Sequence, residues 1–265
     1  MNETIKTINN RTSLRRFSNE KVSIEEQDII INAALRAPTA GNLMLYSILK
    51  IEDKETLEKL SVSCDQQPFI ATASFALVFL VDFQKMYDYF SYNNFFSYCK
   101  EQDSIPKLPD LSDLLLGSED AICAAQNSVI AAESINIGSC YIGDIIENYE
   151  FHKSLFKLEK LTFPLGMLVF GKYPDNYKPQ VRERFNRKFV VFNDTYQRLS
   201  KEELDKMFEH QAKEFVQNNK FEAKNYAQYL YARKFGSDFA NEMRRSVNLA
   251  YEEWLSYGKE VMKFF

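Results

Sequence analysis

The sequence lacks the histidine and cysteine patterns that build metal centres and disulfide frameworks. It has only two histidines and four cysteines in 265 residues. These residues are His152, His210, Cys64, Cys99, Cys123 and Cys140. Because zinc sites and disulfide scaffolds need such residues at short, regular spacing, the sequence predicts neither a metal nor a disulfide framework. Each cysteine is interpreted as a small buried apolar side chain rather than a nucleophile.

Long apolar runs and an excess of positive charge are lacking as well. No stretch approaches the roughly 18 apolar residues of a membrane-spanning helix, and the opening segment MNETIKTINNRTSLRRF has no apolar signal core. The chain has 33 Lys and Arg residues and 37 Asp and Glu residues, which gives a formal charge of -4. It therefore lacks the excess of positive charge that typically binds nucleic acid or anionic lipid. We therefore expect a cytoplasmic protein with no nucleic-acid or membrane partner.

The composition that remains is that of an ordinary globular protein. Hydrophobic residues make up 45% and charged residues 26% of the chain, which is too apolar for a disordered protein. A chain of 265 residues is long enough for one large domain or two small ones, and it needs no disulfide to support its core.

Helical and strand patterns alternate along the chain up to about residue 172. Ser23-Ile-Glu-Glu26 has capping-box spacing and predicts a helix from about Ile24 to Arg36, which Pro38 ends. Further helices are expected at 54–62 and 118–135, and strands at 46–51, 74–81, 139–143 and 163–172. The alanine-rich segment 118–135 is apolar on more than one side, as a central helix surrounded by protein would be. This alternation predicts an α+β or layered α/β domain.

Two regions depart from this alternation. Residues 83–109 are dense in Tyr and Phe and end with two prolines, so we expect an inserted helix and loop. From Lys201 onward, helical segments rich in charged residues are expected near 201–218, 221–234 and 239–263.

Two clusters of arginines are candidate phosphate ligands. The segment from Arg11 to Arg16 supplies three guanidiniums and the hydroxyl of Ser13. Arg182 and Arg184 would project from the same side of an extended chain. Arginine suits a phosphate because its guanidinium group stays charged and can donate hydrogen bonds to two oxygens at once. Each cluster taken alone is nevertheless more typical of a solvated surface charge.

Three polar segments are candidates for contact with a planar ring. The loop Ala37-Pro-Thr-Ala-Gly-Asn42 is built from small residues that allow close backbone approach. Gln67 carries an amide that both donates and accepts, and Tyr141-Ile-Gly-Asp144 follows an expected strand with a glycine among its backbone N–H groups. Taken singly, the loop and the segment 141–144 can each be a simple turn, and Gln67 is more commonly an exposed glutamine.

In their order along the chain, these segments resemble the nitroreductase-like FMN-dependent oxidoreductases. The nearest resemblance is to the oxygen-insensitive NADPH nitroreductase and NADPH-flavin oxidoreductase group. The matching motifs are Arg-x-Ser-x-Arg-x-Phe from Arg11, Pro-Thr-Ala-Gly-Asn from Pro38, Ala-Ala-Gln-Asn from Ala124, Ile-Gly-Ser-Cys-Tyr-Ile-Gly from Ile137, and the two late arginines before Asn193-Asp-Thr-Tyr196. The likeness runs from about Thr4 to Tyr196, with a further match at Arg244-Arg245-Ser246.

The resemblance implies an architecture and an assembly. It implies an α+β nitroreductase-like sandwich with a central mixed or antiparallel sheet, a central helix and a helical C-terminal extension. Residues 1–196 would form the FMN-binding core with the aromatic insertion at 83–109. Residues 197–265 would form the extension, packed on the core or on a dimer partner. The assembly would be a homodimer with one FMN at each of two subunit interfaces.

The resemblance also implies a set of FMN-binding residues. They are Arg11, Thr12, Ser13, Arg15, Thr39, Ala40, Gly41, Asn42, Gln67, Tyr141, Ile142, Gly143, Asp144, Arg182 and Arg184. Arg11 and Ser13 would lie near the phosphate and ribityl chain, and Arg182 with Arg184 at the phosphate. Arg15 would lie beside flavin N1 and the C2 carbonyl.

The remaining implied residues surround the flavin ring. Residues 39–42 would pack along the isoalloxazine, Gln67 would lie at its pyrimidine edge, and residues 141–144 would border the ring near N5. Three positions depart from the family pattern. Met44 stands where many relatives have glutamine, Thr12 replaces a basic or imidazole residue, and Asp144 replaces what is often glycine.

The function implied is that of an FMN-dependent NAD(P)H oxidoreductase. It would reduce nitro, quinone or related small organic acceptors in a ping-pong cycle, with Arg15 stabilising the negative charge that develops near flavin N1. Arg233 and Lys234 are candidates to meet the 2′-phosphate of NADPH, the donor favoured over NADH. The aromatic insertion would serve equally as a lid over flat acceptors or as a cover for the dimer surface.

Two alternative functions stay open. The first is an NAD(P)H-flavin reductase that supplies reduced FMN, which differs only in the acceptor. The second, from another class, is a non-catalytic flavin-binding redox sensor or interaction module whose helical tail docks a partner.

Overall fold

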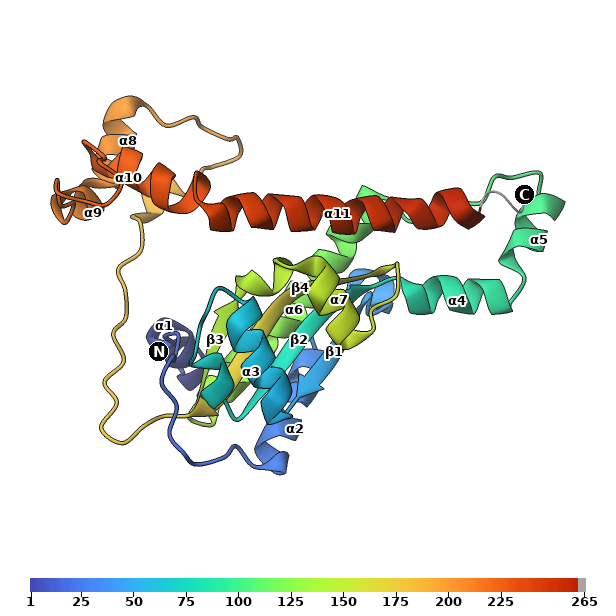
Figure 1. Ribbon diagram of the computed structural model, residues 1–265, viewed down its shortest axis with the longest axis horizontal. Coiled ribbons are helices and arrows are strands. Elements are labelled where there is room, and N and C mark those ends of the chain that lie inside the picture. Colours follow the sequence, from blue (N-terminus) through green and yellow to red (C-terminus); the bar gives the residue numbers. More distant parts are fainter. Residues whose placement is uncertain (262–265) are drawn as a thin grey trace. The chain divides into compact units, whose positions relative to one another are not determined.

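A four-stranded antiparallel sheet forms the centre of the fold. The computed structural model describes the backbone of residues 1–261 and the side chains up to residue 257. The strand order is β1-β2-β4-β3, and every neighbouring pair is antiparallel (Figure 1). The strands are β1 (Tyr46–Ile51), β2 (Phe75–Asp82), β3 (Ile137–Ile142) and β4 (Thr162–Lys172).

The other regular elements are helices and short helical turns. The helices in the first two thirds of the sequence are α1 (Glu3–Asn10), α2 (Ile24–Leu35), α3 (Lys54–Ser63), α4 (Gln84–Tyr92), α5 (Phe95–Glu101), α6 (Leu111–Ser134) and α7 (Tyr149–Phe156). The later helices are α8 (Lys201–Met207), α9 (Glu209–Lys213), α10 (Tyr226–Leu230) and α11 (Asp238–Val261). Short 3-10 turns lie at Ala40–Asn42, Ile70–Thr72, Gly143–Ile146 and Arg187–Phe189, and a π-helical turn lies at Tyr231–Phe235.

The two faces of the sheet are covered by different helices, because successive side chains of a strand point to opposite faces. On one face, Phe75, Leu77 and Phe79 of β2 pack with α2 and the central helix α6. On the other face, Ala76 and Val78 pack with α3 (Figure 1). The fold is therefore an α+β sandwich with α6 as its central helix.

A third cluster joins the aromatic insertion to the C-terminal helix. Trp254 of α11 is only 1% exposed, and its ring meets Phe83 edge-on with centroids 5.7 Å apart. Tyr87 of α4 likewise meets Tyr257 at 6.2 Å, and its hydroxyl donates to the carbonyl of Lys107. One face of the insertion is thus buried against α11, while Tyr92 remains exposed.

The chain divides into two compact units. Residues 1–179, together with the C-terminal helix from Glu242, form the unit that contains the sheet. Residues 180–241 form the second unit, which contains α8, α9 and α10. Inside the second unit, a groove of about 770 Å³ is lined by side chains that include Leu204, Phe208 and Tyr226.

The expected helices and strands of the sheet-containing unit are confirmed, with shifts at their ends. The central helix is longer than expected at 118–135, because Asp110 caps a start at Leu111 in a capping box with Asp113. Helices α1 and α7 were not expected. Their short sequences carry no long apolar period, and α7 both follows and precedes a residue with left-handed backbone.

The expectations for the second unit are partly wrong. The segment 201–218 is broken at Phe208 and its second helix ends at Lys213, and 221–234 becomes helical only at Tyr226. The side chain of Asn219 accounts for the delay. It donates to the carbonyl of Ala223 and accepts from the N–H groups of Phe221 and Ala223, which holds a turn in place of a helix. The expected helix 239–263 is α11, and positions 262–263 lie outside the described residues.

Candidate functional site

The N-terminal basic segment is fixed against β3 and β4. Ser13 pairs with Ser139, and the N–H of Leu14 donates to the carbonyl of Ser139 at 2.9 Å. Beneath this segment, Gly138 and Gly171 are cross-strand partners. A Cβ on Gly138 would lie 2.3 Å from Leu14, and one on Gly171 would lie 2.5 Å from Phe17. The two glycines therefore create the space in which the segment packs.

This packing gathers three of the predicted ligands around Cys140 of β3. Burial raises the pKa of the Cys140 thiol, and the charges of Arg15 and Arg11 and a hydrogen bond from Ser13 oppose that rise. Arg15 is exposed and Arg11 and Ser13 are half-buried, so all three keep access to solvent. Thr12 instead is buried, and its hydroxyl has no hydrogen-bond partner among the described residues.

The loop at 39–45 is held from below by Asp120 of the central helix. The two carboxylate oxygens of Asp120 accept from the N–H of Ala40 at 2.9 Å and from the N–H of Leu45 at 3.2 Å. Between these anchors, Gly41 and Asn42 have left-handed backbone with φ of 57° and 59°. Asp120 is only 4% exposed, so the anchor lies in the protein interior while the loop faces outward.

Asp120 was missed by sequence reasoning. The available signal was the position of Asp120 directly before the apolar, alanine-rich run of the central helix, since a carboxylate that becomes buried requires partners. Nothing in the sequence indicates that those partners lie 80 and 75 positions away.

Gln67 and Asp144 are brought into direct contact although they are 77 positions apart. Gln67 Nε2 donates to Asp144 Oδ2 at 3.0 Å and to the carbonyl of Cys64 at 2.9 Å. Asp144 lies in the 3-10 turn that follows β3, and Gln67 lies just after α3. The structure thus joins two of the sequence-predicted segments at one edge of the sheet.

The end of β3 and the first residue of that turn leave backbone accessible. Tyr141 is 38% exposed, and its hydroxyl donates to Gln126 of α6 at 3.4 Å. Ile142 is buried in the core cluster below β3, which leaves only its backbone for a ligand. A Cβ on Gly143 would meet no atom within 4 Å, so the space above this glycine is open.

A buried acid lies next to this turn. Glu147 is 6% exposed, and burial raises its pKa to about 7, with the nearby charges of Asp144, Asp65 and Glu242 adding to the rise. Its Oε1 has no hydrogen-bond partner in the described part of the chain.

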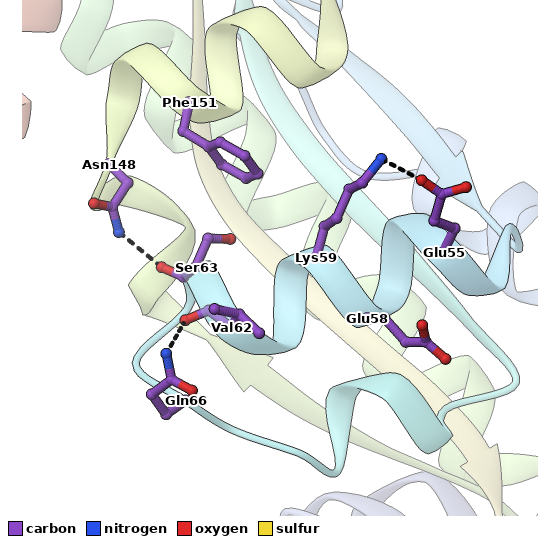
Figure 2. A pocket seen from close by; sticks show the side chains of 8 residues that line it. All are labelled: Glu55, Glu58, Lys59, Val62, Ser63, Gln66, Asn148 and Phe151. Carbon is purple, nitrogen blue, oxygen red and sulfur yellow. Dashed lines mark hydrogen bonds and ion pairs between the residues drawn. The ribbon is translucent and has the colours of Figure 1, made fainter.

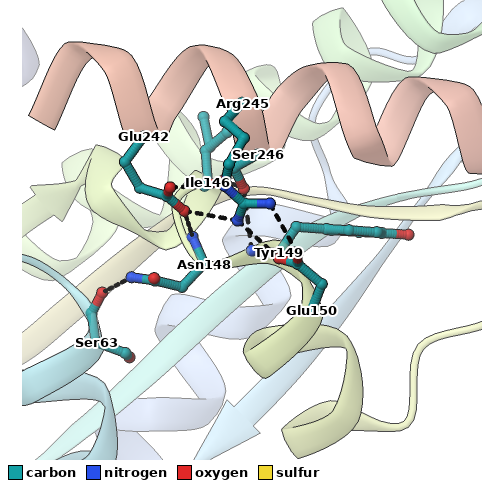
Figure 3. A network of polar contacts seen from close by, with 8 residues as sticks. All are labelled: Ser63, Ile146, Asn148, Tyr149, Glu150, Glu242, Arg245 and Ser246. Atoms are coloured by element: carbon teal, nitrogen blue, oxygen red, sulfur yellow. Dashed lines mark hydrogen bonds and ion pairs between the residues drawn. The ribbon is translucent and has the colours of Figure 1, made fainter. Parts of the chain in front are cut away.

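A polar network attaches the C-terminal helix close to the same turn (Figure 3). Arg245 pairs through both terminal nitrogens with the carboxylate of Glu150 at 2.8 and 2.9 Å, and it also bonds to Glu242. Ser246, which is fully buried, donates to the carbonyl of Ile146 at 2.6 Å and accepts from the N–H of Tyr149 at 3.0 Å. The network fixes α11 against the chain that leaves the turn at 143–146.

A separate pocket of about 740 Å³ lies between α3 and α7 (Figure 2). Its lining residues are Glu55, Glu58, Lys59, Val62, Ser63, Gln66, Asn148 and Phe151. None of the residues predicted to bind FMN or NADPH is among them.

The remaining candidates belong to the other compact unit. Arg182 and Arg184 are exposed in an irregular segment, and Arg233 and Lys234 are exposed in the π-helical turn at Tyr231–Phe235. The guanidinium of Arg233 lies over the ring of Tyr229 at 6.0 Å. The structure therefore groups Arg11, Ser13 and Arg15 in one unit and these four cations in the other, and their roles stay predictions.

The residues gathered in the sheet-containing unit fit FMN by their chemistry. Arg11, Arg15 and Ser13 supply cations and a hydroxyl suited to a phosphate ester or to an electron-rich ring edge. Gly41 and Gly143 leave backbone uncovered, as close approach to a flat ring requires.

Among the described residues, no group of three or more His, Cys, Asp or Glu side chains is placed to hold a metal. None of their helices combines the length and apolarity needed to cross a membrane.

Comparison with known proteins gives matches over most of the chain. The Nitroreductase family model matches residues 8–172. The chain is 31% identical over 203 residues to an FMN reductase (NADPH) from Bacillus subtilis, covering 74% of this chain and 75% of that protein. It is 31% identical over 216 residues to an oxygen-insensitive NADPH nitroreductase from Salmonella typhimurium, covering 82% and 84%. The structure of nitroreductase A from Vibrio parahaemolyticus matches with a TM-score of 0.77 at 25% identity, covering 95% and 98% of the two chains.

Proposed function

Because the chain belongs to the Nitroreductase family, we propose that it is an FMN-dependent NAD(P)H oxidoreductase that reduces nitro, quinone or related small organic acceptors. The observation that carries the proposal is the convergence of Arg11, Ser13 and Arg15 on β3, beside the open backbone that follows the same strand at Gly143. Both curated relatives described above carry names of NADPH-dependent flavin or nitro-group reductases.

We propose that the chain contributes binding and electrostatics to this reaction. Bound FMN would supply the hydride-accepting and electron-donating ring. Arg15, exposed near β3 with a fixed positive charge, would stabilise negative charge at the pyrimidine edge of that ring. Arg11 and Ser13 would hold the phosphate and ribityl chain. Arg182 and Arg184 are proposed as further phosphate ligands on the basis of the family resemblance alone.

The loop at 39–42 would support the flat face of the ring. The hydrogen bonds from Ala40 and Leu45 to Asp120 order the loop in the absence of a ligand. FMN binding would therefore lose no free energy to ordering of the loop. Gln67 would lie at the pyrimidine edge, and residues 141–144 would border the ring with their backbone. Thr12 has a buried side chain, so it would act through its backbone.

For the electron donor we propose NADPH in preference to NADH. Arg233 and Lys234 are adjacent, exposed cations, and a 2′-phosphate is the group that distinguishes the two nicotinamide cofactors. Donor and acceptor would use the site in turn, in a ping-pong cycle. Parallel initial-rate lines are expected, and intersecting lines would contradict the cycle.

A second candidate function is a flavin reductase that releases reduced FMN. It is favoured by the name of the FMN reductase (NADPH) from Bacillus subtilis, one of the relatives matched over about three quarters of this chain. The two functions separate when free FMN is compared with nitro and quinone compounds as acceptors in the same assay.

We propose a homodimer and a cytoplasmic location. The central helix carries Leu111, Leu115 and Ile122 at helical spacing, and they are 47%, 59% and 45% exposed. An exposed apolar stripe of this kind, on a helix that buries another face in the core, suits a subunit interface. All four cysteines are free, as in proteins of a reducing compartment. Light scattering of the purified protein should give twice the mass of the chain.

The decisive experiment is the absorbance spectrum of the purified protein before and after anaerobic addition of NADPH. A yellow protein that bleaches with NADPH and recovers with an acceptor is the expected result. A colourless protein that does not take up added FMN would refute the proposal. Bleaching without sustained turnover would favour a passive redox sensor.

A further inference from the structure

The side-chain amide of Gln67 has a fixed orientation. Its Nε2 donates to the carbonyl of Cys64 at 2.9 Å and to Oδ2 of Asp144 at 3.0 Å. A primary amide has two N–H donors, so both are in use. A backbone carbonyl only accepts, and the nitrogen rather than the oxygen of the amide must therefore face Cys64.

The backbone of Gln67 is held as firmly as its side chain. Its N–H donates to the carbonyl of Ser61 at 2.7 Å, and its carbonyl accepts from the N–H of Ile70 at 3.1 Å. The residue is half-buried, so rotation of its side chain is restricted. The one polar atom of Gln67 that no described donor reaches is Oε1, and this atom can only accept.

From this geometry we infer that Asp144 is a positioning residue. Together with the carbonyl of Cys64, it turns the Gln67 amide so that Oε1 accepts a hydrogen bond from N3–H of a bound flavin. The inference rests on the proposed function, because it requires FMN at this site. The pyrimidine edge of a flavin carries one donor, N3–H, between two carbonyl acceptors. An amide that offers only its oxygen matches the donor and not the carbonyls.

A consequence for specificity follows from this arrangement. A flavin with a methyl group on N3 has lost the donor, so its binding leaves Oε1 of Gln67 without a partner. Loss of one partner of a buried hydrogen bond lowers affinity by about tenfold or more. The side chain of Asp144 would therefore contribute to the choice of ligand through Gln67, in addition to the backbone contact proposed for residues 141–144.

The test is a titration of the full-length, FMN-free protein with FMN and with 3-methyl-FMN, followed by quenching of flavin fluorescence. The wild-type protein should bind FMN about tenfold or more tightly than 3-methyl-FMN. In Asp144→Ala this ratio should fall by about threefold or more, because one of the two bonds that orient the amide is lost. Asp144→Asn should keep the wild-type ratio, because its side-chain oxygen still accepts from Gln67.

Two further variants distinguish the positioning of Gln67 by Asp144 from an effect of negative charge and from steric exclusion of the N3-methyl group. Asp65→Asn removes a neighbouring exposed carboxylate that no hydrogen bond joins to Gln67, and it should keep the wild-type ratio. Gln67→Ala should abolish the discrimination, and adding Asp144→Ala to it should change nothing more. In the proposed arrangement Asp144 contacts Gln67 and not N3, so a purely steric preference would survive Asp144→Ala.

The outcomes distinguish this inference from the proposed function. Equal binding of the two flavins by the wild-type protein, or an unchanged ratio in Asp144→Ala, would overturn the role of Asp144 while FMN binding stands. Failure of the protein to bind FMN at all would overturn both.

Discussion

Asp120 of the central helix accepts a hydrogen bond from the N–H of Ala40 at 2.9 Å, and so holds the loop that is proposed to face the flavin. The same carboxylate accepts from Leu45 at the other end of the loop. One buried side chain therefore connects the core packing of α6 with the shape of the binding surface.

Asp120→Asn should weaken both the fold and the binding of FMN. An amide keeps one accepting oxygen but turns an NH2 group toward the second N–H, so the free energy of unfolding should fall by about 1–3 kcal/mol. The dissociation constant for FMN should rise by about tenfold as the loop loses its anchor. Urea unfolding and flavin titration measure the two effects. Glu119→Gln, at the exposed neighbouring position, is the control and should leave the unfolding free energy unchanged.

Gly138→Ala should displace the basic segment from the sheet. The added methyl group would lie 2.3 Å from a Leu14 side-chain carbon, so Leu14 must move and Arg15 with it. We expect a loss of about 1–3 kcal/mol of stability, together with weaker FMN binding. Gly166→Ala in β4 is the matched control, because no atom lies within 4 Å of its new Cβ. Equal behaviour of the two variants would contradict the packing argument.

Ser246→Ala should loosen the C-terminal helix. The change leaves the N–H of Tyr149 and the carbonyl of Ile146 without their buried partner, which costs about 1–3 kcal/mol. Faster hydrogen exchange is expected at the start of α7. Ser256→Ala on the same helix removes only a bond to the carbonyl of Glu253 and should have little effect. An intact exchange pattern in Ser246→Ala would show that other contacts hold α11 in place.

Glu147→Gln should remove a destabilisation that appears as the pH rises. Burial raises the pKa of Glu147 from 4.5 to about 7, so the folded state binds more protons than the unfolded state between those values. Stability therefore falls with increasing pH across this window, and the penalty is complete above about pH 7. The variant should match the wild type near pH 4 and exceed its unfolding free energy by about 1–2 kcal/mol at pH 8.

Glu150 provides a control of opposite sign for this pH experiment. Hydrogen bonds from Arg245 lower its pKa to about 2, so its contribution to stability is present above about pH 4.5 and is lost as the pH falls toward 2. Glu150→Gln should therefore be less stable than the wild type at neutral pH, with a difference that shrinks in acid. If the curves of Glu147→Gln and the wild type ran parallel from pH 4 to 8, Glu147 would titrate normally.

Arg233→Ala combined with Lys234→Ala should affect NADPH and spare NADH. Loss of the two exposed cations would remove charge-assisted bonds to the 2′-phosphate, and KM for NADPH should rise about tenfold with little change in kcat. KM for NADH should stay constant. Lys224→Ala, an exposed cation in the same compact unit, is the control. Equal effects on both donors would place the 2′-phosphate elsewhere.

Much of the fold could be predicted from the sequence, because its elements carry local signals. The capping box at Ser23 and Glu26 and the short continuous apolar run of β2 identify their elements without knowledge of any contact. The non-helical stretch around Asn219 was missed, because a side chain that bonds to nearby backbone can replace a helix even where the composition favours one.

The sequence by itself determined the family, the α+β class and the segments that are candidates for FMN, since ordered motifs and hydrophobic periods are properties of the chain alone. Only the tertiary structure decided how those segments act together. It placed Asp120 beneath the loop, closed the Gln67 and Asp144 contact across 77 positions, and buried Thr12 while exposing Arg15. The physical reason is that a hydrogen bond depends on the distance and direction between two groups, and for distant residues these are set by the packing of the whole core.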